Sequence, residues 1–96
     1  MPDEPTAPND EARQVATATA FLERLSIPAN ARDFRLRQEF FRHGWDVRVR
    51  DEGGAWSVRA VKADRPEVDG QGSTEGHALR RALAAALGAD ETNGSS

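Results

Sequence analysis

The chain of 96 residues carries a formal net charge of −3 and contains no cysteine. This length allows one small domain, and the missing cysteine excludes disulfides, thiolate metal ligands and a thiol nucleophile. No apolar run approaches the roughly 18 residues of a membrane span, and no basic-then-apolar signal segment starts the chain, so we expect a cytoplasmic protein that does not bind membranes.

Both ends of the chain have compositions typical of disorder. Residues 1–9 are rich in proline and acidic residues, and residues 89–96 are small and polar. Neither stretch can bury enough apolar surface to offset its ordering entropy. We therefore expect a disordered acidic tail over 1–9, a single α+β domain over 10–88 and a second disordered tail over 89–96. So small a domain is compatible with a homodimer but does not require one.

The first helix is expected between Asn9 or Asp10, either of which can cap it, and Ser26, close to Pro28. Its apolar residues recur at steps of three and four and form one stripe. The stripe consists of Val15, Ala18, Leu22 and Leu25.

A second helix is expected over residues 29–43, with Gly44 ending it. Phe34 and Phe41 lie seven residues apart, and Leu36 and Phe40 lie four apart, which gives the helix a broad apolar surface. We therefore expect this helix to form the centre of the core.

Residues 45–63 alternate apolar and polar side chains with the period of two that is typical of strands, and a glycine-containing turn divides them into a hairpin. A two-residue loop at Glu52-Gly53 and a four-residue loop from Asp51 to Gly54 predict the same register. That register places three pairs on one buried face: Val49 with Trp56, Val47 with Val58, and Trp45 with Ala60.

The opposite, outer face of this hairpin is the main candidate site. The same register places Arg48 opposite Ser57 and Asp46 opposite Arg59 as a cross-strand charge pair. Four basic residues are the candidates for binding a partner or phosphate: Arg48, Arg50, Arg59 and Lys62. A secondary basic surface is expected on the second helix, from Arg35, Arg37 and Arg42.

After the hairpin, Pro66 suits a third edge strand near residues 67–69. Ser73 or Thr74 then caps a final helix, which we expect to end near Leu87, before Gly88. The element order predicts an α+β two-layer sandwich with two N-terminal helices, an antiparallel hairpin and a C-terminal helix packed on the sheet.

The sequence offers little support for catalysis or metal binding. The two histidines, His43 and His77, do not form a metal-binding spacing, and we expect neither a catalytic residue nor a cofactor. The segment 70–73 precedes a helix and has free backbone N–H groups for an anion, but it lacks the Gly-Lys-Ser/Thr of a phosphate-binding loop. A helix-capping loop is the simpler interpretation.

The glycine-rich approach at 70–73 and the alanine- and leucine-rich helix after it resemble the double-stranded-RNA-binding domain. That resemblance implies a sheet closed by a C-terminal helix. The positions that carry phosphate-binding lysines in that family are Glu75, Gly76 and Leu79 here, so the final helix is expected to be a structural lid.

Residues 45–87 also resemble the HicB-like antitoxins, whose signature matches Gly72, Thr74, Ala78 and Leu79. That resemblance implies a toxin protein as the partner. Two helices precede the hairpin and no DNA-binding segment follows, in contrast to that family.

Taken with the net charge, these features predict a small non-enzymatic module that binds a protein partner in an antitoxin-like or regulatory role. The alternative is a nucleic-acid-binding module that uses the arginine-rich hairpin face. Such a module would use the positive charge of residues 32–62, which contain eight basic and five acidic residues.

Overall fold

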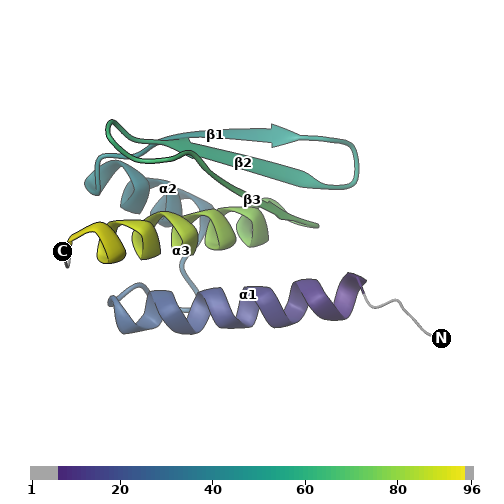
Figure 1. The fold of residues 1–96 in the computed structure, drawn as a ribbon. Coiled ribbons are helices and arrows are strands. Elements are labelled where there is room, and N and C mark those ends of the chain that lie inside the picture. Colours follow the sequence, from purple (N-terminus) through teal and green to yellow (C-terminus); the bar gives the residue numbers. More distant parts are fainter. Residues whose placement is uncertain (1–6, 95–96) are drawn as a thin grey trace.

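The computed structural model describes residues 7–94 of the chain. Three helices and three strands occur in the order α1 (Ala7–Arg24), α2 (Asp33–Arg42), β1 (Asp46–Asp51), β2 (Trp56–Val61), β3 (Val68–Gly72) and α3 (Glu75–Gly94) (Figure 1). The strands form one antiparallel sheet in the order β1-β2-β3. The predicted α+β sandwich, including the edge strand after the hairpin, is confirmed.

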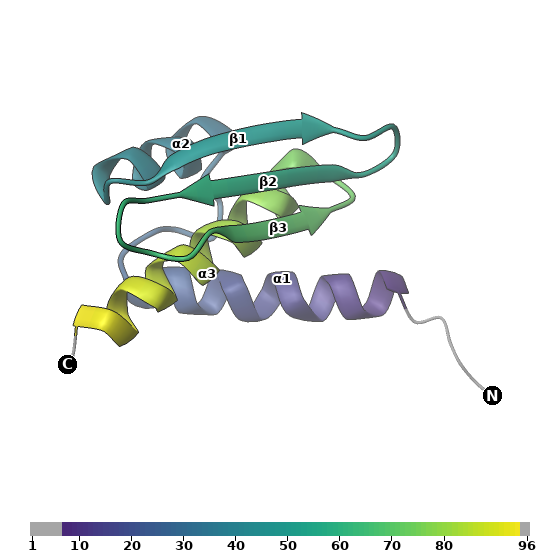
Figure 2. The same cartoon turned by 45° about the horizontal axis from the view of Figure 1, so that its top comes forward.

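The helices lie on one side of the sheet. In both cartoon views α3 runs between α1 and α2, and α2 and α3 lie against the sheet (Figures 1 and 2). Helix α1 packs against α3 through Ala18 and Leu22, whose side chains are buried. No helix in residues 7–94 covers the other face of the sheet (Figure 2). None of the described helices is long and apolar enough to cross a membrane.

The hairpin turn has two residues, but it lies one residue further along the chain than the predicted Glu52-Gly53 loop. Glu52 N–H donates to the carbonyl of Ala55 at 2.8 Å, so the loop is the dipeptide Gly53-Gly54, with φ values of 72° and 107°. Positive φ at both central residues is the requirement of the turn that best matches strand twist, and glycine meets it without steric cost. The predicted register is therefore wrong by two residues.

The observed register pairs Val49 with Val58 and Val47 with Ala60. A shift of two residues keeps every side chain on its predicted face, because side chains alternate along a strand. The predicted charge pair is lost, since Asp46 lies opposite Val61 rather than opposite Arg59.

Strand β3 and helix α3 approach closely because both present small residues to each other. A Cβ atom added to Gly70 would lie 2.5 Å from the carbonyl oxygen of Ala78 and 2.5 Å from the amide nitrogen of Ala82. At Gly72 the nearest atom to an added Cβ would be 2.6 Å away, on His77. The glycines that looked like part of a loop are strand residues, and they let the backbone of β3 lie directly on the helix.

Helix α2 buries less of its apolar surface than predicted. Leu36 and Phe40 are fully buried, whereas the side chains of Phe34 and Phe41 are 72% and 59% exposed. Leu36 and Phe40 face α3 and β1, and the two exposed phenylalanines lie on the opposite side of the helix. The prediction that the whole apolar surface of this helix is core is wrong, because the described part of the chain packs against one side of the helix only.

Helix α3 does not end before Gly88 but continues to Gly94. Helix α1 begins at Ala7, ahead of its predicted caps. Of the two segments expected to be disordered, residues 1–6 and 95–96 lie outside the described part, whereas 7–9 and 89–94 are helical.

Candidate interaction surfaces

The outer face of the sheet carries the predicted arginine cluster. Arg48 and Arg50 project from β1 and Arg59 from β2, and together with Ser57 they line a shallow hollow on the face that no described helix covers. Three of the four predicted residues are therefore brought together.

The arginines of this outer face differ in their partners. Arg59 Nε lies 3.3 Å from Asp69 Oδ1 on β3 and 3.7 Å from Glu67 Oε1. Arg48 and Arg50 have no acidic partner within the described residues, and Arg48 lies directly opposite Arg59 in the sheet register. The positive charge of the face is thus concentrated on β1.

Lys62, the fourth predicted residue, is not part of this face. Its ammonium group lies over the ring of Trp45 at 5.8 Å from the centroid and 3.3 Å from Asp90 Oδ1. Asp90 also accepts hydrogen bonds from Trp45 Nε1 at 2.9 Å and Arg65 Nε at 3.2 Å. Burial opposes ionisation of Asp90, but these hydrogen bonds and the Lys62 charge outweigh it and lower the pKa of Asp90. Lys62 therefore has a structural role.

The predicted secondary basic surface lies on α2, on the helical side of the sheet. Arg35 Nε and Arg42 Nη1 lie 2.9 Å and 3.4 Å from the buried carboxylate of Glu39. Arg37 forms an ion pair with Glu75 at the start of α3. Helix α2 lies on the inner side of the sheet (Figure 2). The hairpin arginines project from the outer face, so the two sets of arginines do not form one continuous surface.

Helix α2 also carries an apolar surface that sequence reasoning missed. Phe34 and Phe41 are two turns apart on the same exposed side, with Gln38 between them. The seven-residue spacing was visible in the sequence, but spacing shows only that two side chains share a face and not that the face is covered. We call Phe34, Gln38 and Phe41 the phenylalanine face of α2.

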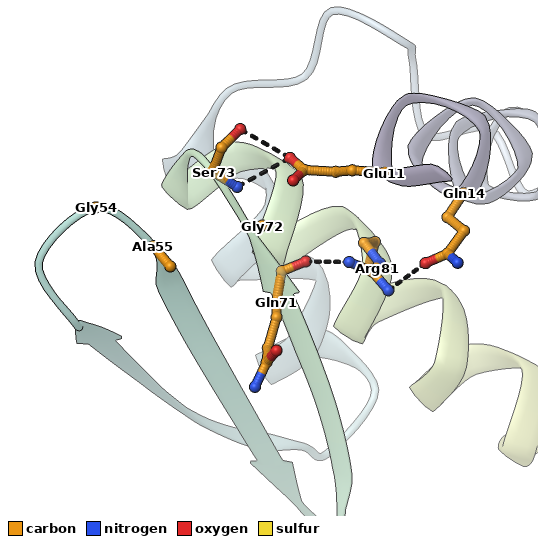
Figure 3. A pocket seen from close by; sticks show the side chains of 8 residues that line it. All are labelled: Glu11, Gln14, Gly54, Ala55, Gln71, Gly72, Ser73 and Arg81. Atoms are coloured by element: carbon orange, nitrogen blue, oxygen red, sulfur yellow. Dashed lines mark hydrogen bonds between the residues drawn. The ribbon is translucent and has the colours of Figure 1, made fainter. Parts of the chain in front are cut away.

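The backbone groups before the final helix, which were considered as an alternative anion site, are occupied by a side chain of the same protein. Figure 3 shows Glu11 of α1 reaching Ser73, whose backbone N–H and hydroxyl donate to Glu11 Oε2 at 2.9 Å and 2.8 Å. The same oxygen lies 2.7 Å from His77 Nδ1. The pKa of Glu11 falls to about 2. The largest cause is the hydrogen bond from the backbone N–H of Ser73, and the second is the hydrogen bond with the His77 side chain. The carboxylate occupies the position an external anion would take at this helix N-terminus.

The pocket around this carboxylate is bounded by α1, β3, α3 and the hairpin turn (Figure 3). Arg81 closes it by donating to the side chain of Gln14 and to the carbonyl oxygen of Gln71. Polar groups from three elements are thus already paired with each other, which leaves little for a ligand to bind.

Both histidines are engaged with carboxylates. His77 contacts Glu11, and His43 Nε2 lies 3.8 Å from Glu39 Oε1. Within residues 7–94 no group of three or more His, Cys, Asp or Glu side chains could hold a metal ion.

The residues that resemble the HicB-like signature build the junction between β3 and α3. Thr74 caps the helix by accepting the backbone N–H of His77 at 3.1 Å, while Ala78 and Leu79 are fully buried. This junction requires a small residue, a cap and an apolar pair whatever the chain binds. Comparison of the chain with models of known protein families, with curated proteins and with solved structures found no match.

Proposed function

We propose that this protein is a non-enzymatic module that binds a protein partner through the phenylalanine face of α2. The observation that carries the proposal is the exposure of Phe34 and Phe41, at 72% and 59%, on one side of one helix. Single exposed apolar residues are normal on protein surfaces, but two large aromatic rings two turns apart on the same side of one helix form a patch.

Binding a partner would remove these rings from water. Full burial of a phenylalanine side chain contributes about 1.5–3 kcal/mol, so the two rings could supply a substantial part of a micromolar affinity. Aromatic residues and arginines are also the residue types that contribute most at protein interfaces. The phenylalanine face has both, since Arg37 and Arg42 lie beside it on α2.

The charge around the face indicates which partner fits. Residues 32–42 of the chain hold Arg32, Arg35, Arg37 and Arg42. The acidic residues of this stretch are Asp33 and the buried Glu39, and Glu75 of α3 pairs with Arg37, so the surface of the helix keeps a small excess of positive charge. We infer a partner segment that presents apolar side chains together with Asp or Glu.

A second copy of the chain fits this face less well. In a symmetric dimer the same patch meets itself, so the arginines of one α2 would face those of the other. The charge pattern therefore favours a different protein over a homodimer. The resemblance of residues 45–87 to HicB-like antitoxins suggests one such protein, a toxin encoded beside this chain.

The nucleic-acid alternative has weaker support. On and beside the outer face of the sheet, Arg48, Arg50 and Arg59 are balanced by Asp46, Asp69 and Glu67. Nucleic acid gains affinity when a protein contacts several of its phosphates at once, and the carboxylates that border this small arginine cluster oppose contacts beyond it.

The proposal can be tested with a displayed library of helical peptides selected on the full-length protein. Selected peptides should combine apolar residues with Asp or Glu, and their binding should perturb the NMR signals of α2. The variant F34S/F41S should weaken the binding of these peptides by more than about tenfold, because both aromatic anchors are lost.

The matched control is R13S/R24S, which alters two exposed residues of α1 and should bind the peptides with the affinity of the wild type. Peptides that bind F34S/F41S with the same affinity as the wild type would refute the proposal. If the library yields binders, a purified protein encoded next to the gene should compete with them for α2.

A further inference from the structure

The outer face of the sheet contains a like-charge contact that acidic residues of the described chain relieve on one side only. Arg48 and Arg59 are direct cross-strand partners in the β1-β2 register. Side chains in such positions have Cβ atoms about 4.5–5.5 Å apart, and like charges there are unfavourable. Asp69 and Glu67 approach Arg59 from the β3 side, but no acidic side chain lies between Arg59 and β1.

Hydrogen-bond donors from β1 and β2 lie together around the Arg48–Arg59 pair. Arg50 lies opposite Ser57 and on the same face as Arg48, two residues along β1. The guanidinium groups of Arg48 and Arg50 and the hydroxyl of Ser57 have no hydrogen-bond partner among the described residues. These residues, with Arg59, are the lining of the hollow. The backbone at all four residues is fixed by the pairing of β1 with β2.

We propose that this hollow binds a single doubly charged tetrahedral oxyanion, of the phosphate monoester or sulfate type. Guanidinium groups match such an anion because each can donate two parallel hydrogen bonds to a pair of its oxygens. An anion between Arg48 and Arg59 would also replace their repulsion with two attractive contacts, and the Ser57 hydroxyl is placed to donate a further hydrogen bond.

The neighbouring acidic residues favour one isolated anion over a polyanion. Asp46 lies at one end of β1, and Glu67 and Asp69 border the cluster along β3. A phosphate chain that extended beyond the hollow would meet these carboxylates. This oxyanion site is independent of the function proposed for α2, because it lies on the other side of the sheet (Figure 2).

The test is a titration of the full-length protein with sodium phosphate and sodium sulfate at constant ionic strength, followed by NMR. Saturable shifts are expected at the amides of residues 48–50 and 57–59 and at the Nε–H signals of Arg48 and Arg50. Lowering the pH from 8 to 5 should weaken phosphate binding, as the dianion is protonated, and should leave sulfate binding unchanged.

Two variants distinguish binding at this site from non-specific attraction of anions to the positive charges of the protein. R48S/R50S should raise the dissociation constant for both anions by about tenfold or more. R13S/R24S, which removes the same charge from α1, should leave it within about twofold of the wild type. Equal losses in the two variants, or shifts that never saturate, would show that the anions only screen the surface and would overturn the proposal.

A third variant should bind the anions more tightly. E67Q/D69N releases Arg59 from its carboxylate partners, so the dissociation constant should fall several-fold if Arg59 faces the anion. An unchanged value would remove Arg59 from the site and contradict the arrangement proposed here.

The source of the oxyanion is tested by comparing inorganic phosphate with a short phosphoserine peptide of otherwise glycine and serine residues. Tighter binding of the peptide at the same residues would identify the natural ligand as a phosphorylated protein segment, whereas equal binding would identify it as the free anion. A short DNA duplex that binds more tightly than either, with a steep dependence on salt, would show a polyanion surface and overturn the proposal.

Discussion

The indole N–H of Trp45 donates a 2.9 Å hydrogen bond to the carboxylate of Asp90, a residue 45 positions further along the chain. Trp45 is the largest fully buried side chain of the core, and Asp90 lies in the extension of α3 beyond its predicted end. The contact joins the start of the sheet to the end of the last helix, and Lys62 and Arg65 bind the same carboxylate.

Asp90→Ala should lower the free energy of unfolding by about 1–3 kcal/mol, because it leaves the buried indole N–H and two cations without their acceptor. Chemical denaturation followed by tryptophan fluorescence measures the effect. Glu91→Ala is the control, since this exposed neighbour has no ion pair in the described structure, and it should change stability by less than about 0.5 kcal/mol. Equal effects would mean that the end of α3 does not dock on Trp45.

Glu11→Gln should reduce stability by about 1 kcal/mol at pH 7, which is typical for an anion at a helix N-terminus. The folded-state pKa of Glu11 is about 2 and its ordinary value is 4.5. A lowered pKa stabilises the fold above the ordinary value, and this contribution is lost as the pH falls through the folded one. The difference between wild type and variant should therefore disappear between about pH 4.5 and pH 2.

Urea denaturation at several pH values measures this difference. Glu23→Gln, an exposed change on the same helix, should show no such dependence. A gap between wild type and Glu11→Gln that stays constant down to pH 2 would mean that the ionised carboxylate is not what holds α1 to α3.

Truncation of the adjacent residues Phe40 and Phe41 should change stability by very different amounts. Phe40 is fully buried, so Phe40→Ala should cost about 3–5 kcal/mol, enough to unfold much of so small a domain. Phe41 is 59% exposed, and Phe41→Ala should change stability by less than about 0.5 kcal/mol. Thermal melts of the two variants provide the comparison, and a large loss in Phe41→Ala would place that ring in the core.

Gly70→Ala tests the close approach of β3 to α3. The added methyl group would lie 2.5 Å from backbone atoms of Ala78 and Ala82, which cannot move aside as a flexible side chain would. Overpacking of this kind costs about 1–3 kcal/mol, and a value near the upper end is expected. A neutral result in thermal melts would mean that the strand and the helix are further apart.

Gly88→Ala should have the opposite sign. Gly88 is inside α3, and the nearest atom to an added Cβ outside its own helix is Phe21 Cζ at 4.0 Å. Alanine in a helix interior is more stable than glycine by about 0.5–1 kcal/mol, so the melting temperature should rise. A fall in melting temperature would support the sequence-based prediction that the helix ends before this residue.

The two faces of the hairpin follow from local alternation in the sequence. Alternation places Val47, Val49, Val58 and Ala60 on one side of the sheet in any register that differs by two residues, which is why the faces were predicted correctly while the pairing was not. The cap of α3 was likewise local information, since Thr74 and the helix it starts are neighbours in the chain. The turn was local too, but two adjacent glycines allow several loops.

Which apolar and charged residues take part in packing depends on contacts between elements that are distant in the sequence. Helical spacing groups Phe34 with Phe41, but burial depends on whether another element lies against that side, and none does within the described residues. In the same way Asp90 falls in a segment that was expected to be disordered, and Glu11 lies near the start of a helix with no partner nearby in the sequence. Their roles come from partners more than 40 positions away, at Ser73 and Trp45, and no periodicity in the sequence encodes such distant pairings.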